Sequence, residues 1–120
     1  MHAQSIMGGR PMSMDQLKVE KAVREYREGL ETLFGDQLVG VTLYGSFARG
    51  EGREDSDVDV LCVLRGRFDY GEAVRRSSEL TASLSLTYDV VLSRVFVSEA
   101  DLKTRHLPFF MNVRREGVPA

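Results

Sequence analysis

The chain has 120 residues, of which 42% are hydrophobic and 28% are charged. This length suits a single domain with one hydrophobic core, and the balance excludes a largely disordered chain. Lysine and arginine total 16 against 18 acidic residues, giving a formal net charge of −2 without the basic excess that nucleic-acid binders usually show.

No segment approaches the roughly 20 apolar residues that a membrane-spanning helix needs. The N-terminal residues lack the apolar core of a secretory signal. The one cysteine, Cys62, excludes an internal disulfide framework, suits a reducing compartment and is expected in the core. We therefore expect a cytoplasmic protein with no membrane partner and no direct nucleic-acid binding.

In chain order, residues 1–12 contain glycines, a proline and methionines without periodicity, which predicts a flexible leader ahead of one domain over residues 13–120. From Ser13 to Gly35, apolar residues recur every three or four positions, which predicts an amphipathic helix. The apolar stripe of this helix consists of Val19, Val23, Tyr26, Leu30 and Leu33.

Residues 38–44 (LVGVTLY) and 57–64 (DVDVLCVL) are rich in β-branched and apolar side chains and predict two strands. The segment between them predicts a short helical turn and a loop. Beyond Asp59 the second strand is expected to be buried on both faces, because its residues stay apolar at every position. Alternation places four side chains on one of these faces: Asp57, Asp59, Leu61 and Val63.

Asp69 and Glu72 stand three residues apart, as in a capping box, and predict the start of a second long helix that runs to about Ser85. Residues 86–97 predict a third strand, and residues 107–115 predict a further helix. This order of elements predicts an α/β fold, in which helices pack on a small mixed sheet.

A Gly-Ser pair follows the first predicted strand directly. Glycine permits backbone conformations and close approaches that other residues do not, and a serine hydroxyl beside backbone N–H groups can hold phosphate oxygens. Gly45 and Ser46 are therefore candidates for a phosphate-binding turn. The alternative is an ordinary turn at the end of a strand.

Two aspartates open the second predicted strand. Asp57 and Asp59 share a face, and their positions lie about 7 Å apart along the strand. Two anions this close repel each other unless a cation offsets them, and Mg²⁺ favours carboxylate oxygens together with substrate phosphates. The pair is a candidate metal site, and the alternative is a solvated strand end.

Asp89, near the start of the third predicted strand, would join the aspartate pair if the two strands were neighbours. The alternative for this residue is again a solvated strand start. Taken together, the Gly-Ser turn and the three carboxylates fit two-metal phosphoryl or nucleotidyl transfer.

Gly45-Ser46, ten intervening residues and then Asp57-Val58-Asp59 resemble the GSx10DxD signature of the DNA polymerase β-like nucleotidyltransferase superfamily. The longer string YGSFARGEGREDSDVDVLCVL resembles the minimal nucleotidyltransferase branch, whose members pair with HEPN-domain proteins as prokaryotic toxin–antitoxin systems. The resemblance spans roughly residues 13–117 and implies the polymerase β-like palm fold.

By position, the resemblance implies that Asp57 and Asp59 bind metal and that Asp89 is the third carboxylate, which binds the catalytic metal and helps to deprotonate the acceptor hydroxyl. Gly45 and Ser46 match the turn that holds the triphosphate. The resemblance also offers further candidates for contacts with the nucleotide, namely Ser56, Arg49 and Arg53. The two arginines have the alternative of exposed salt bridges within the loop.

The function that the resemblance implies is a nucleotidyltransferase antitoxin with two Mg²⁺ ions. It would transfer AMP from ATP to a tyrosine hydroxyl of a cognate HEPN toxin. One alternative is a binding module that blocks its partner by occlusion, and another is a nucleotidyltransferase for a small molecule, for whose substrate pocket this length leaves little room. The apolar group Leu107, Phe109, Phe110 and Met111 either packs against the first helix or forms a partner-binding patch.

Overall fold

The structure, a computed structural model, describes residues 14–53 and 55–120. The leader predicted over residues 1–12 lies outside the described residues. Helix α1 (Met14–Phe34) is followed by a short 3-10 helix, η1 (Gly35–Gln37), and strand β1 (Leu38–Tyr44). Strand β2 (Val58–Leu64) leads to helix α2 (Tyr70–Tyr88) and strand β3 (Leu92–Ser98). The chain closes with α3 (Glu99–Thr104), α4 (Pro108–Glu116) and a short β4 (Val118–Pro119).

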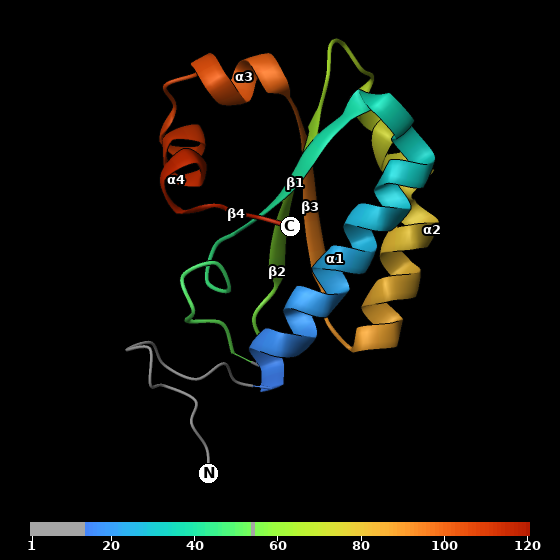
Figure 1. Ribbon diagram of the computed structural model, residues 1–120, viewed down its shortest axis with the longest axis vertical. Coiled ribbons are helices and arrows are strands. Elements are labelled where there is room, and N and C mark those ends of the chain that lie inside the picture. Colours follow the sequence, from blue (N-terminus) through green and yellow to red (C-terminus); the bar gives the residue numbers. More distant parts are fainter. Residues whose placement is uncertain (1–13, 54) are drawn as a thin grey trace.

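The four strands form one mixed sheet in the order β3-β2-β1-β4. Strand β2 pairs antiparallel with β1 and parallel with β3, so β2 is a central strand with a hydrogen-bonded neighbour on each side. The predicted α/β fold with a small mixed sheet is therefore confirmed. Helices α1 and α2 cover one face of the sheet, and α3 and α4 lie on the other (Figure 1).

The face under α1 and α2 holds the larger part of the core. Along α1, the predicted stripe packs on this face, with Leu33 only partly buried. Strand β2 contributes every second side chain to this face: Val58, Val60, Cys62 and Leu64. Beneath α2, the Tyr26 hydroxyl is 2.8 Å from the hydroxyl of Thr81, which satisfies two polar groups inside the core.

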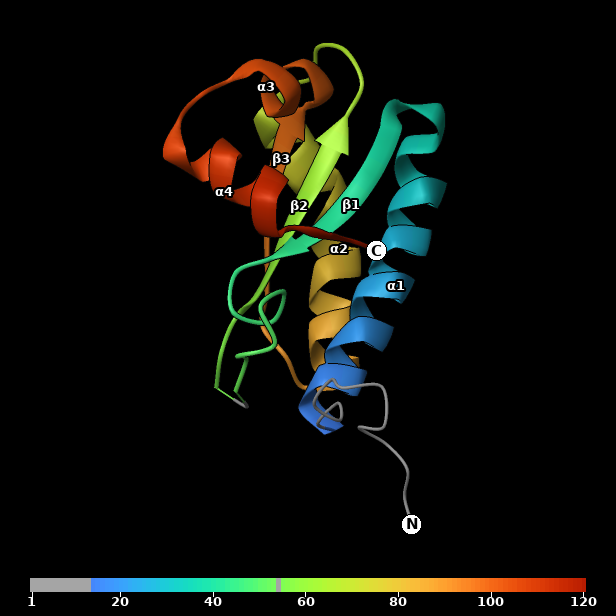
Figure 2. The same ribbon diagram turned by 60° about the vertical axis from the view of Figure 1, so that its left-hand side comes forward.

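The face under α3 and α4 is thinner. Its buried side chains come from β2, β3 and α4 and comprise Leu61, Val63, Val97, Phe110 and Val113. Figure 2 shows the two helices of this face on the side of the sheet opposite α1. The expectation that Phe110 packs against the first helix is therefore wrong, because the intervening sheet separates the two helices.

Local sequence signals fix the helix starts well. The Asp69 carboxylate accepts a hydrogen bond from the backbone N–H of Glu72 at 3.0 Å, which confirms Asp69 as the cap of α2. Within the described residues, no helix combines the length and apolar character that a membrane crossing requires.

The third strand begins later than its residue pattern predicts. Helix α2 continues to Tyr88, and β3 starts only at Leu92. Leu84 is buried one helical turn before Tyr88, and the Tyr88 hydroxyl donates a hydrogen bond to the Glu25 carboxylate on α1. Packing against α1 thus outweighs the β-branched composition of this segment.

Candidate active site

The turn after β1 is built around a glycine that touches a carboxylate. Gly45 has a φ of 75°, in the left-handed region that favours glycine. A Cβ atom at this position would lie 2.3 Å from the Asp59 Oδ2 atom. Backbone conformation and close approach therefore both require glycine here, and the predicted Gly-Ser turn lies directly against the predicted aspartate pair.

The loop that follows Gly45 is anchored in the core by Phe47. The Phe47 side chain is buried, and its ring lies so close to Gly52 that a Cβ atom added to Gly52 would be 2.2 Å from the ring. The Gln16 side chain on α1 donates a hydrogen bond to the Phe47 carbonyl at 3.2 Å. These contacts hold the loop against the rest of the domain, beside the first residues of β2.

The two aspartates lie at the amino end of β2. Asp59 pairs with Tyr44 across the antiparallel ladder and shares a sheet face with Leu61 and Val63. This is the thin face, on which α4 lies. Asp57 is exposed, whereas Asp59 is half-buried.

Burial raises the pKa of the Asp59 carboxyl, and the negative charge of Asp57 raises it further. Arg49 opposes this shift of the pKa with its positive charge. The two carboxylates therefore repel each other, and a bound cation would relieve that repulsion. The donor set of two neighbouring carboxylates suits Mg²⁺, which takes its remaining oxygen ligands from water and phosphates.

Arg49 lies in the loop after Gly45 and is exposed. Its Nε atom donates to the Glu51 carboxylate at 3.0 Å, and its Nη1 atom is 3.9 Å from Oε1 of Glu116 on α4. The salt-bridge alternative for Arg49 is thus present in this structure. Because these contacts are solvent-exposed and individually weak, the guanidinium is available to an incoming phosphate.

Ser56 and Arg53 close the loop before β2. The Arg53 backbone N–H donates to the Ser56 hydroxyl at 3.0 Å, and the Ser56 N–H donates to the Arg53 carbonyl at 2.9 Å. Both residues border a cavity of about 610 Å³, together with Asp55, Asp89, Val90 and Val91. This volume lies within the range of about 300–1,000 Å³ that is typical of small-molecule sites.

The prediction that Asp89 lies on a strand is wrong. Asp89 ends α2 in the left-handed conformation, with a φ of 53°, which aspartate tolerates better than most residues. On β3, the residue that pairs with Asp59 is Ser93. Nowhere in residues 14–53 and 55–120 do three side chains of His, Cys, Asp or Glu gather closely enough to hold one metal ion. Asp89 instead borders the cavity of about 610 Å³ described above.

A second, smaller cavity of about 200 Å³ borders Gly45, the glycine that lies against the Asp59 carboxylate. Its lining comes from the end of β1, the turn and α4: Tyr44, Gly45, Arg49, Phe109, Asn112, Val113 and Glu116. Sequence reasoning singled out neither Asn112 nor Glu116. The available signal was helical spacing, because Phe109, Asn112 and Glu116 recur at intervals of three and four along one helix face.

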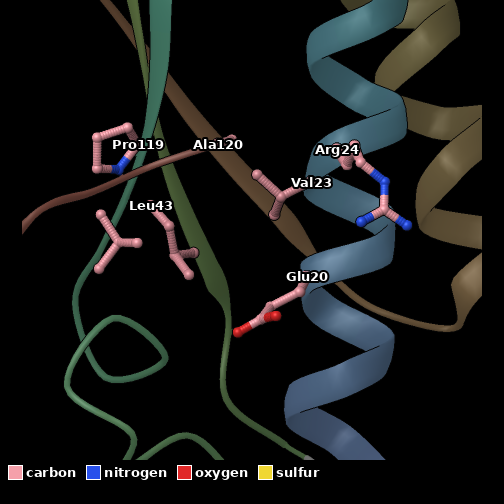
Figure 3. A pocket seen from close by; sticks show the side chains of 7 residues that line it. Glu20, Val23, Arg24, Leu43, Pro119 and Ala120 are labelled. Carbon is pink, nitrogen blue, oxygen red and sulfur yellow. The ribbon is translucent and has the colours of Figure 1, made fainter.

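Another cavity, of about 250 Å³, lies between α1, β1 and the C-terminal residues (Figure 3). Leu43 and Val23, which line it, belong to the core of the α1 and α2 face. Glu20 and Arg24 supply its charged groups, and Figure 3 shows the Glu20 carboxylate turned toward the strands. Because Asp59 lies on the opposite face of the sheet, this cavity is separate from the aspartate site.

Comparisons with known proteins agree with this geometry. A family model described as a nucleotidyltransferase domain matches residues 23–112. A relative from Methanocaldococcus jannaschii, named as a protein adenylyltransferase, is 33% identical over 99 residues, covering 82% of this chain and 93% of its own.

Two solved structures share the fold. A nucleotidyltransferase from Sulfolobus solfataricus superposes with a TM-score of 0.66 at 20% identity, over 94% of this chain and 89% of its own. A toxin–antitoxin structure with AMP-PNP gives a TM-score of 0.54 at 19% identity, over 88% of this chain and 72% of its own.

Proposed function

Because the chain belongs to the nucleotidyltransferase domain family, we propose that it transfers AMP from ATP to a tyrosine hydroxyl of a cognate HEPN-domain toxin and so neutralises that toxin. The observation that carries this proposal is the contact of Gly45 with the Asp59 carboxylate, because it joins both halves of the sequence signature in one site. A relative named as a protein adenylyltransferase and a neighbour that is a toxin–antitoxin structure with AMP-PNP support the choice of acceptor.

Asp57 and Asp59 would hold Mg²⁺, since their two neighbouring carboxylates repel each other without a cation. When bound, the metal supplies positive charge that stabilises the triphosphate and the departing pyrophosphate. A two-ion site with Asp89 as third ligand stays a prediction, and the position of Asp89 at the end of α2 argues against it.

The chain's own residues divide the remaining work. The turn at Gly45 and Ser46 gives phosphate oxygens close access to the carboxylates, because no side chain stands at Gly45. Arg49 would exchange its exposed partners Glu51 and Glu116 for phosphate oxygens. The cavity beside Ser56 and Arg53 has the volume to receive the remainder of the nucleotide.

The decisive experiment measures the intact mass of a candidate HEPN partner after incubation with this protein, ATP and Mg²⁺. We expect a gain of one or more AMP units, and no gain with the Asp57→Asn, Asp59→Asn double variant. Replacing metal ligands should lower the rate at least about 100-fold. Toxin that is neutralised without any gain in mass would instead identify an occluding antitoxin.

Asp89→Asn tests the third carboxylate separately. Asparagine also tolerates the left-handed conformation of residue 89, so the fold is expected to persist. We expect the transfer rate to fall by about tenfold, less than in the double variant, because outer groups affect a metal site less than its ligands do. A loss as large as that of the double variant would show that Asp89 reaches the metal during the reaction.

A further inference from the structure

The smaller cavity is separate from the larger cavity that we assign to the base and sugar of the nucleotide. It lies between the end of β1, the turn at Gly45 and one face of α4, and its volume is about 200 Å³. The larger cavity, of about 610 Å³, is lined by residues 53, 55 and 56, which precede the aspartate pair, and by residues 89–91, which precede β3; it shares no lining residue with the smaller cavity. The larger cavity therefore lies beside one neighbour of β2, strand β3, and the smaller cavity lies beside its other neighbour, strand β1.

We infer that the smaller cavity is the acceptor site and that it binds one aromatic side chain carrying a hydroxyl group. This inference rests on the proposed function, because it assigns the second substrate of the same reaction. It goes further by naming the residues that receive the acceptor: Tyr44, Phe109, Asn112 and Glu116.

Size separates the two substrates. A nucleoside triphosphate contains a base, a sugar and three phosphates, and ligands of that size occupy cavities of about 300–1,000 Å³. The smaller cavity falls below this range, whereas the larger cavity lies within it. A single side chain needs far less space than a nucleotide, so the smaller volume suits an acceptor residue.

The walls of the smaller cavity suit an aromatic guest. The Tyr44 and Phe109 rings meet edge to face, with centroids 5.5 Å apart and an interplanar angle of 90°. Aromatic rings prefer such edge and offset contacts, so a third ring can join the pair without disturbing it. Phe109 is 37% exposed, which leaves ring surface on which a guest can pack.

The two charged groups of the smaller cavity, Glu116 and Arg49, can divide between a hydroxyl and a phosphate. The Glu116 carboxylate on α4 can accept a hydrogen bond from a hydroxyl but would repel a phosphate. Its contact with Arg49 is a long one, at 3.9 Å, so a guest can replace it at little cost. If Arg49 moves to the triphosphate, Glu116 is left with the acceptor hydroxyl as its partner.

Position also favours the acceptor. The smaller cavity borders Gly45, and Gly45 lies against the Asp59 carboxylate. A hydroxyl that reaches this end of the cavity therefore arrives at the same carboxylates as the triphosphate. Two reactants that meet at the same carboxylates are positioned for transfer by proximity.

The test uses N-acetyl-L-tyrosinamide as the probe and follows amide chemical shifts of the full chain by NMR. We expect shifts around Phe109, Asn112 and Glu116, and a separate set around Ser56 and Asp89 on addition of AMP-PNP with Mg²⁺, whereas Gly45 should respond to both ligands. Adenosine that shifts the first set in place of the tyrosine probe would overturn the inference and assign this cavity to the base.

A matched pair of variants on α4 locates the binding. Asn112→Trp places a large ring at the cavity, whereas Met111→Trp places it at the neighbouring exposed position, which does not line the cavity. We expect Asn112→Trp to raise the dissociation constant of the tyrosine probe at least about tenfold and Met111→Trp to change it less than about twofold. Equal effects of the two variants would overturn the inference.

AMP-PNP binding separates the two possible failures. If Asn112→Trp still binds AMP-PNP, its fold and nucleotide site are intact, and the loss of the tyrosine probe is specific to the cavity. If the unmodified protein binds AMP-PNP but not the tyrosine probe, the acceptor assignment is wrong and the proposed function stands. If it binds the tyrosine probe but not AMP-PNP, the proposed function is wrong.

Glu116→Leu, which removes the acceptor oxygens and keeps a similar size, tests the hydrogen bond to the hydroxyl. We expect the unmodified protein to prefer N-acetyl-L-tyrosinamide over N-acetyl-L-phenylalaninamide about fivefold, since the two probes differ only in that hydroxyl. The variant should lose this preference while binding the phenylalanine probe as before. An unchanged preference would show that Glu116 does not receive the hydroxyl.

Discussion

The two faces of the sheet differ in depth and in chemistry. The α1 and α2 face buries a large apolar cluster and satisfies its polar groups internally, as in the hydroxyl pair of Tyr26 and Thr81. Among the described residues, the cluster on the α3 and α4 face comprises five buried side chains, and this face also carries the Asp59 carboxylate and the smaller cavity. The thick face therefore supplies stability, and the thin face leaves space for substrates.

The difference follows from strand β2, which serves both faces. From Val60 to Leu64 every side chain of β2 is buried, so the strand is held rigidly on both sides. At its amino end the pattern changes to Asp57 and half-buried Asp59, where the thin face opens to solvent. A rigid strand that ends in carboxylates positions them more precisely than a loop would.

Gly45→Ala should break this arrangement on the thin face alone. The added Cβ atom would lie 2.3 Å from the Asp59 Oδ2 atom, so the carboxylate must move. Displacing a reacting group by about 1 Å costs on the order of 100-fold in rate, and we expect AMP transfer to fall by at least that factor. The measurement is the rate of gain in acceptor mass under saturating ATP.

Gly50→Ala is the matched control, because Gly50 has nearly the same φ, 74°, but no atom within 4 Å of an added Cβ. Both variants place alanine in the left-handed region and should lose about 1–2 kcal/mol of unfolding free energy. Only Gly45→Ala should lose activity. Equal loss of activity in both would mean that loop strain, and not the contact with Asp59, governs the site.

Leu30→Ala and Phe110→Ala compare the stability of the two faces. Leu30 is fully buried in the large cluster, and its truncation should cost about 3–5 kcal/mol. Phe110 packs in the five-residue cluster, where α4 can collapse onto the gap, so its cost should fall below about 3 kcal/mol. Urea unfolding with an unchanged m value measures both free energies.

We expect the two variants to follow the opposite order in their effect on AMP transfer. At a temperature where both variants are folded, Phe110→Ala should lower AMP transfer more than Leu30→Ala does. Phe110 contacts Phe109 with ring centroids 5.3 Å apart, and Phe109 lines the smaller cavity. If Phe110→Ala proves the more damaging to stability and leaves transfer unchanged, the division between the two faces is incorrect.

Asp59→Asn should produce the smallest effect on stability, and one that depends on pH. Because the pKa of Asp59 is raised in the folded state, the native protein binds this proton more tightly than the unfolded chain does. The free energy of unfolding therefore falls as pH rises above 3.8, the ordinary pKa of the group. Without metal, the asparagine variant should be slightly more stable than the parent at pH 7.

This gain in stability should vanish as pH falls below 3.8, where Asp59 is protonated in both states. Thermal unfolding in a chelating buffer across this range measures the difference. Mg²⁺ should then reverse the order at pH 7, because only the parent retains both carboxylates for the ion. A variant that is less stable at neutral pH without metal would contradict the repulsion between Asp57 and Asp59.

The chain's local patterns are sufficient for most of the elements. The stripe on α1, the strands at residues 38–44 and 57–64, and the cap at Asp69 all follow from side-chain periodicity and hydrogen bonds between near neighbours. The signature from Gly45 to Asp59 also follows from the sequence, because its residue types and spacing are specific. The structure adds the direct contact that joins its two ends.

The position of Asp89 at the end of α2 could not be predicted from local sequence and required the tertiary structure. Its neighbours are β-branched and predict a strand, yet Leu84 and Tyr88 pack toward α1 and extend α2 to residue 88. The competition between local propensity and packing is decided by a helix about sixty residues earlier in the chain. Sequence periodicity alone does not reveal the contact between Tyr88 and α1.

The residues of the chain thus determined the family signature, the element order and the carboxylate pair, because each depends on neighbours in sequence. Only the tertiary structure decided which sheet face α4 covers and which side chains meet beside Gly45. Tyr44 and Glu116 are the last residues of β1 and α4, far apart in the sequence, and they border one cavity because α4 packs on the sheet face beside β1. Contacts between distant segments arise from the burial of shared apolar surface, which no short window of sequence contains.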